Sequence, residues 1–208
     1  MTDRAYPNVR LRLRRTSGAP GAPERTATMV FWLHGARFHL RDETGRAYSD
    51  FIADVAEPRG LGRASRTMED LMDVWSATGR ERAPTDVFAD LSADRAVLIE
   101  EGGEPWTADA ERTVGLADQV FTNGRESELP AAGKRRQLDR ECTEYRLAIE
   151  GEEGGVPYRS DVIWLVSVPY LIRREVRDHP AGRMFAITEL VELEEGAVTE
   201  EDLSPPAV

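Results

Sequence analysis

The chain has 208 residues, 40% of them hydrophobic and 31% charged, which is typical of a folded globular protein rather than a disordered one. This length suffices for one sizeable core, so we expect one domain. The formal net charge of -11 argues against binding to nucleic acid, a polyanion, and against an anionic membrane surface. The composition therefore favours neutral, apolar or basic partners.

The N-terminal residues contain no apolar run of the kind found in secretory signals, and no segment approaches the roughly 20 apolar residues of a membrane span. The single cysteine, Cys142, excludes an internal disulfide and fits a reducing compartment. We therefore expect a cytoplasmic protein without stable membrane insertion. If a leader has been removed, the expectation changes to an extracytoplasmic protein.

Residues 1–55 carry the pattern of β-strands. Apolar residues alternate with arginines over residues 9–14, which predicts a half-buried strand. Residues 26–33 are apolar on both faces and predict a central strand, and residues 36–41 predict its hairpin partner. Residues 46–52 predict a further strand.

Residues 65–125 change character, and we predict a helical insertion there. Its strongest pattern is a set of apolar residues at helical spacing, which predicts an amphipathic helix of roughly three turns at residues 67–79. These residues are Met68, Leu71, Met72 and Trp75.

The rest of this insertion is predicted from weaker patterns. Residues 84–91 predict a short helix, and residues 96–100 predict a buried strand. Residues 107–121 predict a second helix, capped by Thr107 and ended by the Asn-Gly pair that follows.

Residues 137–195 predict four strands joined by short turns, an antiparallel meander. In the second of these strands, Val162, Trp164 and Val166 would share one face. The last strand would carry its apolar residues on one face, and these are Phe185, Ile187, Val191 and Leu193. We expect residues 196–208, which are acidic and contain prolines, to form a flexible tail.

No catalytic, metal or cofactor signature is present. His34 and His39 are five residues apart, which on a hairpin predicts opposite faces, and no histidine or cysteine pair has ligand spacing. Acidic neighbours of Cys142 raise a thiol pKa, so we expect a packing residue rather than a nucleophile. We therefore predict no metal site and no cofactor.

Large apolar side chains follow the strands and the first helix, and two hypotheses explain them. They form an ordinary core, or they line an apolar cavity for a hydrophobic ligand between sheet and helices. The candidate wall residues are Trp32, Phe38, Met68, Met72, Trp75 and Trp164.

Residues 142–205 resemble the end of bacterial lipoprotein-carrier proteins, the LolA/LolB-like superfamily. A V-x-W-[VL] strand is matched by residues 162–165, and a strand of proline followed by apolar and basic residues by residues 169–174. Residues 188–193 match a strand that ends in a glutamate-rich turn, and residues 203–205 match the terminal proline motif. The earlier residues 36–41, with the turn after them, are similar to the strand that follows the first hairpin in these proteins.

This resemblance implies an α+β fold that is mainly antiparallel β: a curved sheet, or half-open barrel, covered by a few helices with an apolar cavity between. Members of the superfamily carry or sense acyl chains. The resemblance therefore implies a hydrophobic small molecule or acyl chain as ligand.

Three functions stay open from the sequence. The first is non-enzymatic binding of a lipid or other hydrophobic ligand. The second is a protein-interaction or accessory module with an acidic docking surface for a protein partner. The third is an enzyme without a motif that acts on an apolar substrate inside a barrel.

Overall fold

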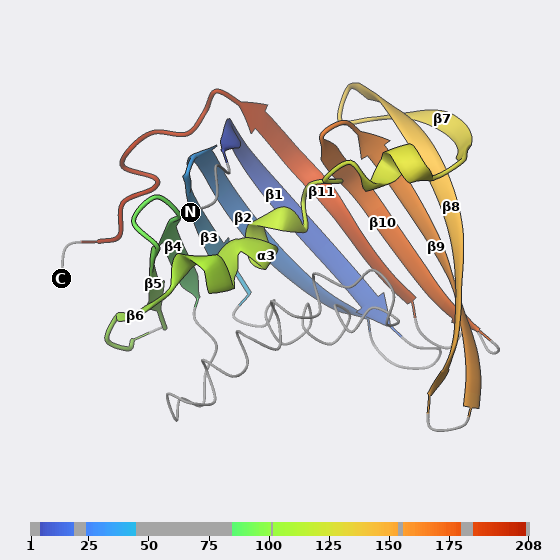
Figure 1. Cartoon of the computed structure of the whole chain (residues 1–208), viewed down its shortest axis with the longest axis horizontal. Helices are drawn as coiled ribbons and strands as arrows, with labels where there is room; N and C mark the ends of the chain where they lie inside the picture. Colours follow the sequence, from blue (N-terminus) through green and yellow to red (C-terminus); the bar gives the residue numbers. More distant parts are fainter. Residues whose placement is uncertain are drawn as a thin grey trace.

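Eleven strands form one antiparallel sheet, shown in the computed structural model of Figure 1. The structure describes residues 5–18, 24–44, 85–100, 102–153, 156–179 and 185–206. The strand order is β6-β5-β4-β3-β2-β1-β11-β10-β9-β8-β7. Each half of the sheet is thus built from consecutive strands, and the first and last strands pair in the middle and join the halves.

The N-terminal half consists of β1 Tyr6–Gly18, β2 Arg25–Gly35, β3 Arg37–Asp42, β4 Asp86–Asp90, β5 Arg95–Ile99 and β6 Trp106–Ala108. The C-terminal half consists of β7 Ala131–Gln137, β8 Arg140–Glu153, β9 Val156–Ser167, β10 Tyr170–His179 and β11 Phe185–Glu195. Along the chain, the segment that connects β6 to β7 contains three short helices. These are the 3-10 helix η1 Ala110–Thr113, the α-helix α3 Val114–Asp118 and the 3-10 helix η2 Arg125–Glu128.

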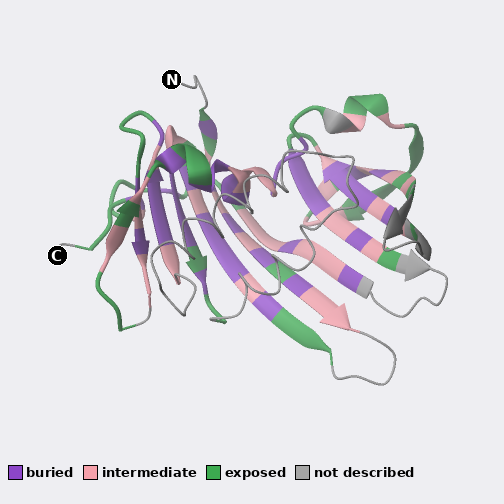
Figure 2. Cartoon of the chain, turned by 60° about the horizontal axis from the view of Figure 1, so that its bottom comes forward, coloured by how far each residue is buried: buried purple, intermediate pink, exposed green. Residues whose placement is uncertain are grey.

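The alternation predicted for the first strand is confirmed. Leu11 and Leu13 of β1 are buried, whereas the arginines between and beside them are half-buried or exposed. Leu11 lies opposite Phe31 of the central strand β2, which is also buried. We call the side of the sheet that carries Leu11, Leu13 and Phe31 the inner face, and the opposite side, which carries Arg10, Arg12 and Arg14, the outer face. Figure 2 shows buried residues recurring along these strands.

The hairpin of β2 and β3 sets which side chains share a face. Gly35, at the end of β2, has a φ of 57°, a left-handed conformation that glycine adopts without strain. The register pairs Leu33 with Phe38 and Trp32 with His39. Phe38 therefore lies on the inner face, and Trp32 and His39 lie on the outer face.

The short helix predicted at residues 84–91 is wrong, because Asp86–Asp90 forms strand β4 between β3 and β5. The apolar pattern of a segment this short is compatible with both a helix and a strand. Hydrogen bonding to the two neighbouring strands stabilises the strand. The strand predicted at residues 96–100 is confirmed as β5. The region predicted as a helical insertion therefore contributes three strands, β4 to β6, to the sheet.

The helix predicted at residues 107–121 is shorter and begins later. Thr107 does not cap a helix but lies in β6, where it pairs with Val97. Helical structure begins at Ala110 and the α-helical part ends at Asp118. Figure 1 shows α3 in front of the sheet, and its side chains Val114 and Leu116 belong to the main core. It is the one α-helix in the described ranges; the helix predicted at residues 67–79 and the strand predicted at residues 46–52 lie outside them.

The predicted C-terminal meander is confirmed as β8 to β11, which follow one another in the sheet. An additional strand, β7, precedes it and pairs with β8. Six of its residues, AAGKRR, are exposed, so no apolar alternation marks it in the sequence.

A β-bulge in β11 overturns the predicted face of the last strand. Leu13 pairs with Leu190, but Arg12 pairs with Glu192, so Val191 is the extra residue. Ile187 therefore lies on the outer face and Leu193 on the inner face, where Leu190 is buried. The apolar residues of this strand do not share one side.

The C-terminal segment after β11 is anchored as far as Leu203, contrary to the expected flexible tail. Val198 and Leu203 are buried. Asn8 donates a hydrogen bond to the Val198 carbonyl and accepts one from its N–H. Arg37 forms an ion pair with Glu200. The chain therefore returns from the end of β11 and packs on the N-terminal half of the sheet.

Candidate functional site

The main apolar cluster is centred on the inner face of the N-terminal half and also includes residues of the C-terminal half, among them Tyr170, Ile172 and Leu190. Phe38 is fully buried in it, and its ring meets the Tyr6 ring edge-on with centroids 5.9 Å apart. Tyr6 stacks on Phe121, which in turn contacts Tyr170 at the start of β10. This candidate wall residue therefore lies in a well-packed core, where burial of a phenylalanine contributes about 1.5–3 kcal/mol.

A second, smaller apolar cluster is centred on Trp164 of β9. Its buried members are Val162, Trp164, Val166 and Leu171. Half-buried apolar side chains pack around them, and these are Leu129, Tyr145, Leu147 and Val176. Trp164 shares a register row with Arg174 of β10 and, through Thr188 of β11, with Arg15 of β1. The Trp164 cluster thus lies on the inner face of the C-terminal half, apart from the main core.

The same row brings two cations to the inner face. Arg15 follows Leu13 in the buried phase of β1 and is 3% exposed, and Arg174 is half-buried. Neither was among the candidate site residues. The sequence does carry a signal for Arg15, because this residue continues the apolar alternation of β1 with a charged side chain.

Trp32 lies on the opposite side of the sheet from Phe38. It is half-buried and stacks on the His39 ring with centroids 4.5 Å apart. The guanidinium groups of Arg10 and Arg41 lie 6.0 and 5.8 Å from its ring centre. Trp32 therefore belongs to the charged outer face, and the structure does not bring it together with Phe38 or Trp164.

Of the candidate wall residues on the strands, Phe38 and Trp164 thus share the inner face but belong to different clusters. Met68, Met72 and Trp75 lie outside the described residues.

His39 is almost fully enclosed on the outer face, with 4% of its surface exposed. Its ring also stacks on Phe88 of β4 with centroids 3.9 Å apart. The imidazole therefore lies between Trp32 of β2 and Phe88 of β4. Nε2 lies 2.8 Å from Asp86 Oδ1 and Nδ1 lies 2.9 Å from the Asp202 carbonyl oxygen. Both ring nitrogens are therefore occupied by hydrogen bonds within the chain.

The two histidines of the hairpin share a face, contrary to the prediction. His34 pairs with Arg37, two residues before His39 on β3, so both histidines lie on the outer face. In the described ranges, no group of three histidine, cysteine, aspartate or glutamate side chains is arranged to hold a metal ion.

Asp86 connects His39 to Arg41, whose Nε donates to the same carboxylate oxygen at 2.7 Å. Burial alone would raise the pKa of Asp86, but the hydrogen bonds from His39 and Arg41 outweigh burial and hold the pKa below its ordinary value. The carboxylate therefore stays ionised and is held by Arg41 and the His39 ring instead of being poised as an acid.

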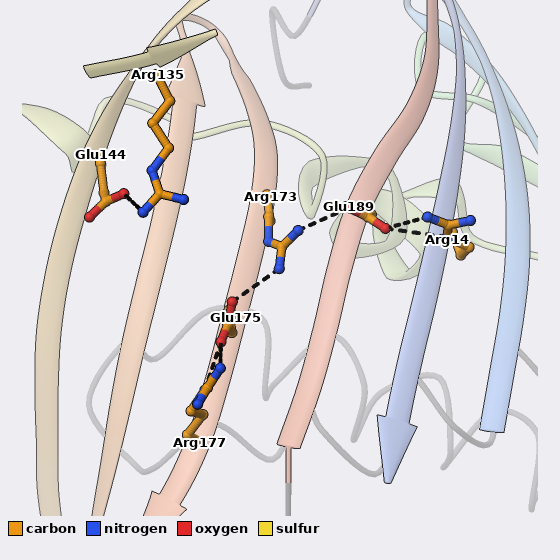
Figure 3. A network of polar contacts seen from close by, with 7 residues as sticks. All are labelled: Arg14, Arg135, Glu144, Arg173, Glu175, Arg177 and Glu189. Atoms are coloured by element: carbon orange, nitrogen blue, oxygen red, sulfur yellow. Dashed lines mark hydrogen bonds and ion pairs between the residues drawn. The ribbon is translucent and has the colours of Figure 1, made fainter. Parts of the chain in front are cut away.

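On the outer face, a ladder of alternating arginines and glutamates crosses β1, β11 and β10, as Figure 3 shows. Glu189 accepts from Arg14 at 2.6 Å and from Arg173 at 3.3 Å. Glu175 accepts from Arg173 at 3.1 Å and from Arg177. Burial would raise the pKa of Glu175, but the hydrogen bonds from these two arginines leave it below its ordinary value.

A similar arrangement surrounds Glu144 on β8. Its carboxylate pairs with Arg135 of β7 and accepts from Arg146 at 2.8 Å. The Arg146 hydrogen bond is the main cause that lowers the pKa of Glu144. Much of the negative charge on this face is thus neutralised by arginine, and these carboxylates do not present an acidic docking surface.

Two further features of the C-terminal half are not apolar sites. Cys142 is buried, and burial raises the pKa of its thiol, as suits a packing residue. A shallow hollow of about 360 Å³ at the β7–β8 hairpin is lined by charged residues. These are Lys134, Arg135, Arg136, Asp139 and Glu141. Neither feature suits a hydrophobic ligand.

In the part of the chain that the structure describes, no helix has both the length and the apolar character required to cross a bilayer.

Comparison with known proteins found no protein-family model and no curated protein that matches the chain. Similar solved structures include an uncharacterized conserved protein from Thermus thermophilus, with 14% sequence identity, a TM-score of 0.38, and coverage of 94% of this chain and 86% of that chain. A LolA superfamily protein from Nitrosomonas europaea has 9% identity and a TM-score of 0.35, covering 97% of this chain and 92% of that chain.

A DUF1329 family protein from Desulfovibrio piger has 8% identity and a TM-score of 0.25, covering 94% of this chain and 89% of that chain. The similar structures thus include a member of the superfamily that residues 142–205 resemble. Because these TM-scores are low, the function is inferred from the geometry described above.

Proposed function

We propose that this protein binds a hydrophobic molecule, such as an acyl chain, against the inner face of its sheet, without catalysing a reaction. The observation that carries this proposal is the Trp164 cluster, a second group of buried apolar side chains on the inner face that the main core does not include. Ligand pockets are lined by apolar and aromatic side chains with a few polar groups beside them. The Trp164 cluster, with Arg174 in the same row, has this composition.

In the proposed arrangement the sheet curves into a half-open barrel, and helices, including the one predicted at residues 67–79, cover its inner face. The ligand would lie between sheet and cover, with Trp164 on the sheet side and Met68, Met72 and Trp75 on the helix side, while Phe38 stays in the main core. The sequence resemblance to lipoprotein carriers supports an acyl chain as ligand.

Tryptophan fluorescence tests this function, because Trp32 and Trp164 lie on opposite faces of the sheet. Titration with dodecanoate is expected to shift the emission of the native protein and of the Trp32→Phe variant by a similar amount. The shift is expected to fall at least about twofold in Trp164→Phe, because a bound chain changes the surroundings of this indole.

Mass spectrometry of the purified protein under native conditions provides an independent measurement. The expected result is an additional mass that corresponds to an acyl-containing molecule. Emission that does not respond to dodecanoate, together with a ligand-free mass, would contradict the proposed function.

A further inference from the structure

Strand β7 is an open edge of the sheet. It is last in the strand order, with β8 on one side and, in the described ranges, no strand on the other. Its first six residues, 131–136, are exposed. The strand at the opposite edge, β6, has three residues, whereas β7 has seven. An exposed edge strand of this length can receive a further strand along its outer side.

The turn between β7 and β8 determines which backbone groups of β7 point outward. The two loop residues, 138–139, have φ of 51° and 56° and lie between the paired residues Gln137 and Arg140. In a hairpin with a two-residue loop, the pair beside the loop exchanges its backbone hydrogen bonds, and every second residue of the strand then faces outward. The backbone N–H and C=O groups of Lys134 and Arg136 therefore point away from β8.

The side chains of β7 suit an acidic neighbour. The strand, AAGKRRQ, begins with three small residues. In the part of the chain that the structure describes, no atom beyond its chain neighbours lies within 4 Å of where a Cβ on Gly133 would be. A partner backbone can therefore approach this half of the strand closely. The other half carries three cations, and β7 has no acidic residue in a chain whose net charge is -11.

The cations of β7 can bind further carboxylates. The side chains of Lys134, Arg135 and Arg136 are 69, 59 and 76% exposed, and each has an acidic partner on the β7–β8 hairpin. An ammonium group has three N–H donors and a guanidinium has five, so one partner does not exhaust them. Exposed ion pairs are also weak, so a second carboxylate can share or replace the first. The same side chains line the hollow of about 360 Å³, which leaves room beside them.

We propose that β7 binds an extended acidic segment of another protein, which adds to the sheet as a further strand. The segment forms backbone hydrogen bonds with Lys134 and Arg136, and its carboxylates bind the cationic side chains of β7. A second copy of β7 is a poor partner, because antiparallel pairing would bring the cations of both strands together. This site lies at the edge of the sheet and does not depend on ligand binding at the inner face.

The test uses two ten-residue peptides, one that alternates threonine with glutamate and one that alternates threonine with glutamine. Fluorescence anisotropy of the labelled peptides measures their affinities for the native protein. The glutamate peptide is expected to bind about tenfold more tightly in about 20 mM salt. In about 500 mM salt the difference is expected to fall below about threefold, because salt screens the charges.

Two variants test whether the peptide pairs with the backbone of β7. Lys134→Ala and Lys134→Pro both remove the ammonium group, but only proline removes the outward N–H. An edge strand tolerates proline where its N–H faces solvent. The affinity for the glutamate peptide is expected to fall about threefold in Lys134→Ala and about fifteenfold in Lys134→Pro. The comparison of the two peptides on the native protein needs no variant, so it holds even if a variant fails to fold.

Equal affinities of the native protein for the two peptides would overturn the acidic partner. Equal affinities of the two variants would overturn the pairing with the strand edge. Binding of neither peptide would overturn the whole inference, as would self-association of the native protein that Lys134→Pro abolishes, measured by sedimentation. Each of these outcomes leaves the proposed function standing, because dodecanoate binding is measured separately.

Discussion

His39 shows how one side chain on the outer face fixes three separate parts of the chain. Its Nδ1 faces a carbonyl oxygen of the C-terminal segment, which can only accept a hydrogen bond, so this nitrogen carries a proton. Its Nε2 faces the Asp86 carboxylate, and the stacked rings of Trp32 and Phe88 hold the imidazole between them. The residue is therefore bound by polar contacts in its plane and by aromatic contacts on its faces.

Replacing His39 by alanine is expected to destabilise the protein by about 2–4 kcal/mol, since the change removes buried packing and leaves Asp86 and the Asp202 carbonyl without this donor. Urea unfolding measures this free energy. His34→Ala is the matched control on the same face, where the exposed side chain predicts a change within about 0.5 kcal/mol. Equal effects of the two substitutions would contradict the structural role of His39.

At the residue scale, the alternation of side chains along single strands was predictable. Which residues of neighbouring strands share a face of the sheet was not. A shift of one residue in a hairpin reverses every side chain on the second strand. The sequence around His34 and Gly35 does not define where the turn begins, so Trp32 and Phe38 were both assigned to one wall. The observed register separates them. Arg174 was missed because its inner position follows from pairing across three strands.

Composition alone predicted a flexible tail after β11, and this prediction is wrong for the segment that contains Val198 and Leu203. Its acidic, proline-containing sequence is typical of a fraying tail, yet Val198 and Leu203 are buried and Asp202 contacts His39. Two apolar residues spaced along a polar stretch give no periodic pattern, so their burial depends on the surface that the sheet offers them. The segment covers the outer-face aromatic stack of the N-terminal half.

Deletion of residues 197–208 is expected to lower the free energy of unfolding by about 3 kcal/mol or more, because it removes two buried apolar side chains and the contact to His39. Deletion of residues 205–208 alone is the control and is expected to change stability by less than about 0.5 kcal/mol, because Pro205 and Pro206 are exposed. Chemical denaturation of both variants measures the difference. A longer deletion as stable as the shorter one would show that the segment does not hold the sheet.

The predictability of the other elements followed the strength of their apolar pattern. β1 and the meander strands alternate clearly, β2 is apolar on both faces, and these strands were predicted. β7 was missed because an exposed strand needs no apolar residues and is held by backbone hydrogen bonds to β8. The bulge at Val191 is set by the fit between β11 and β1, which no local sequence pattern encodes.

At the scale of the whole molecule, the sheet depends on one pairing between the two ends of the chain. β1 and β11 join the half made of β2 to β6 to the half made of β7 to β10. The ion pairs of Arg14 with Glu189 and of Arg12 with Glu192 cross this junction on the outer face.

Engineered disulfides across this junction test the pairing and its bulge. In a Cys142→Ser background, Arg14→Cys with Glu189→Cys and Arg12→Cys with Glu192→Cys are both expected to cross-link, because each pair is directly opposed in the register. The exchanged combination, Arg12→Cys with Glu189→Cys, is expected not to cross-link, because its Cα atoms are more than about 7 Å apart. Gel mobility without reductant distinguishes these outcomes, and cross-linking of the exchanged pair would contradict the register.

The central position of β1 and β11 has a consequence for synthesis of the protein. The ribosome releases β1 well before β11, and at about 5–20 residues per second the delay between them is roughly 10–35 s. During this time the edge of β1 that later receives β11 has no native partner, although β2 and β3 can already pair on its other side. An unpaired strand edge attracts other strands, so the nascent chain is most prone to aggregate in this interval. The two halves of the sheet are therefore united only after β11 has been synthesised.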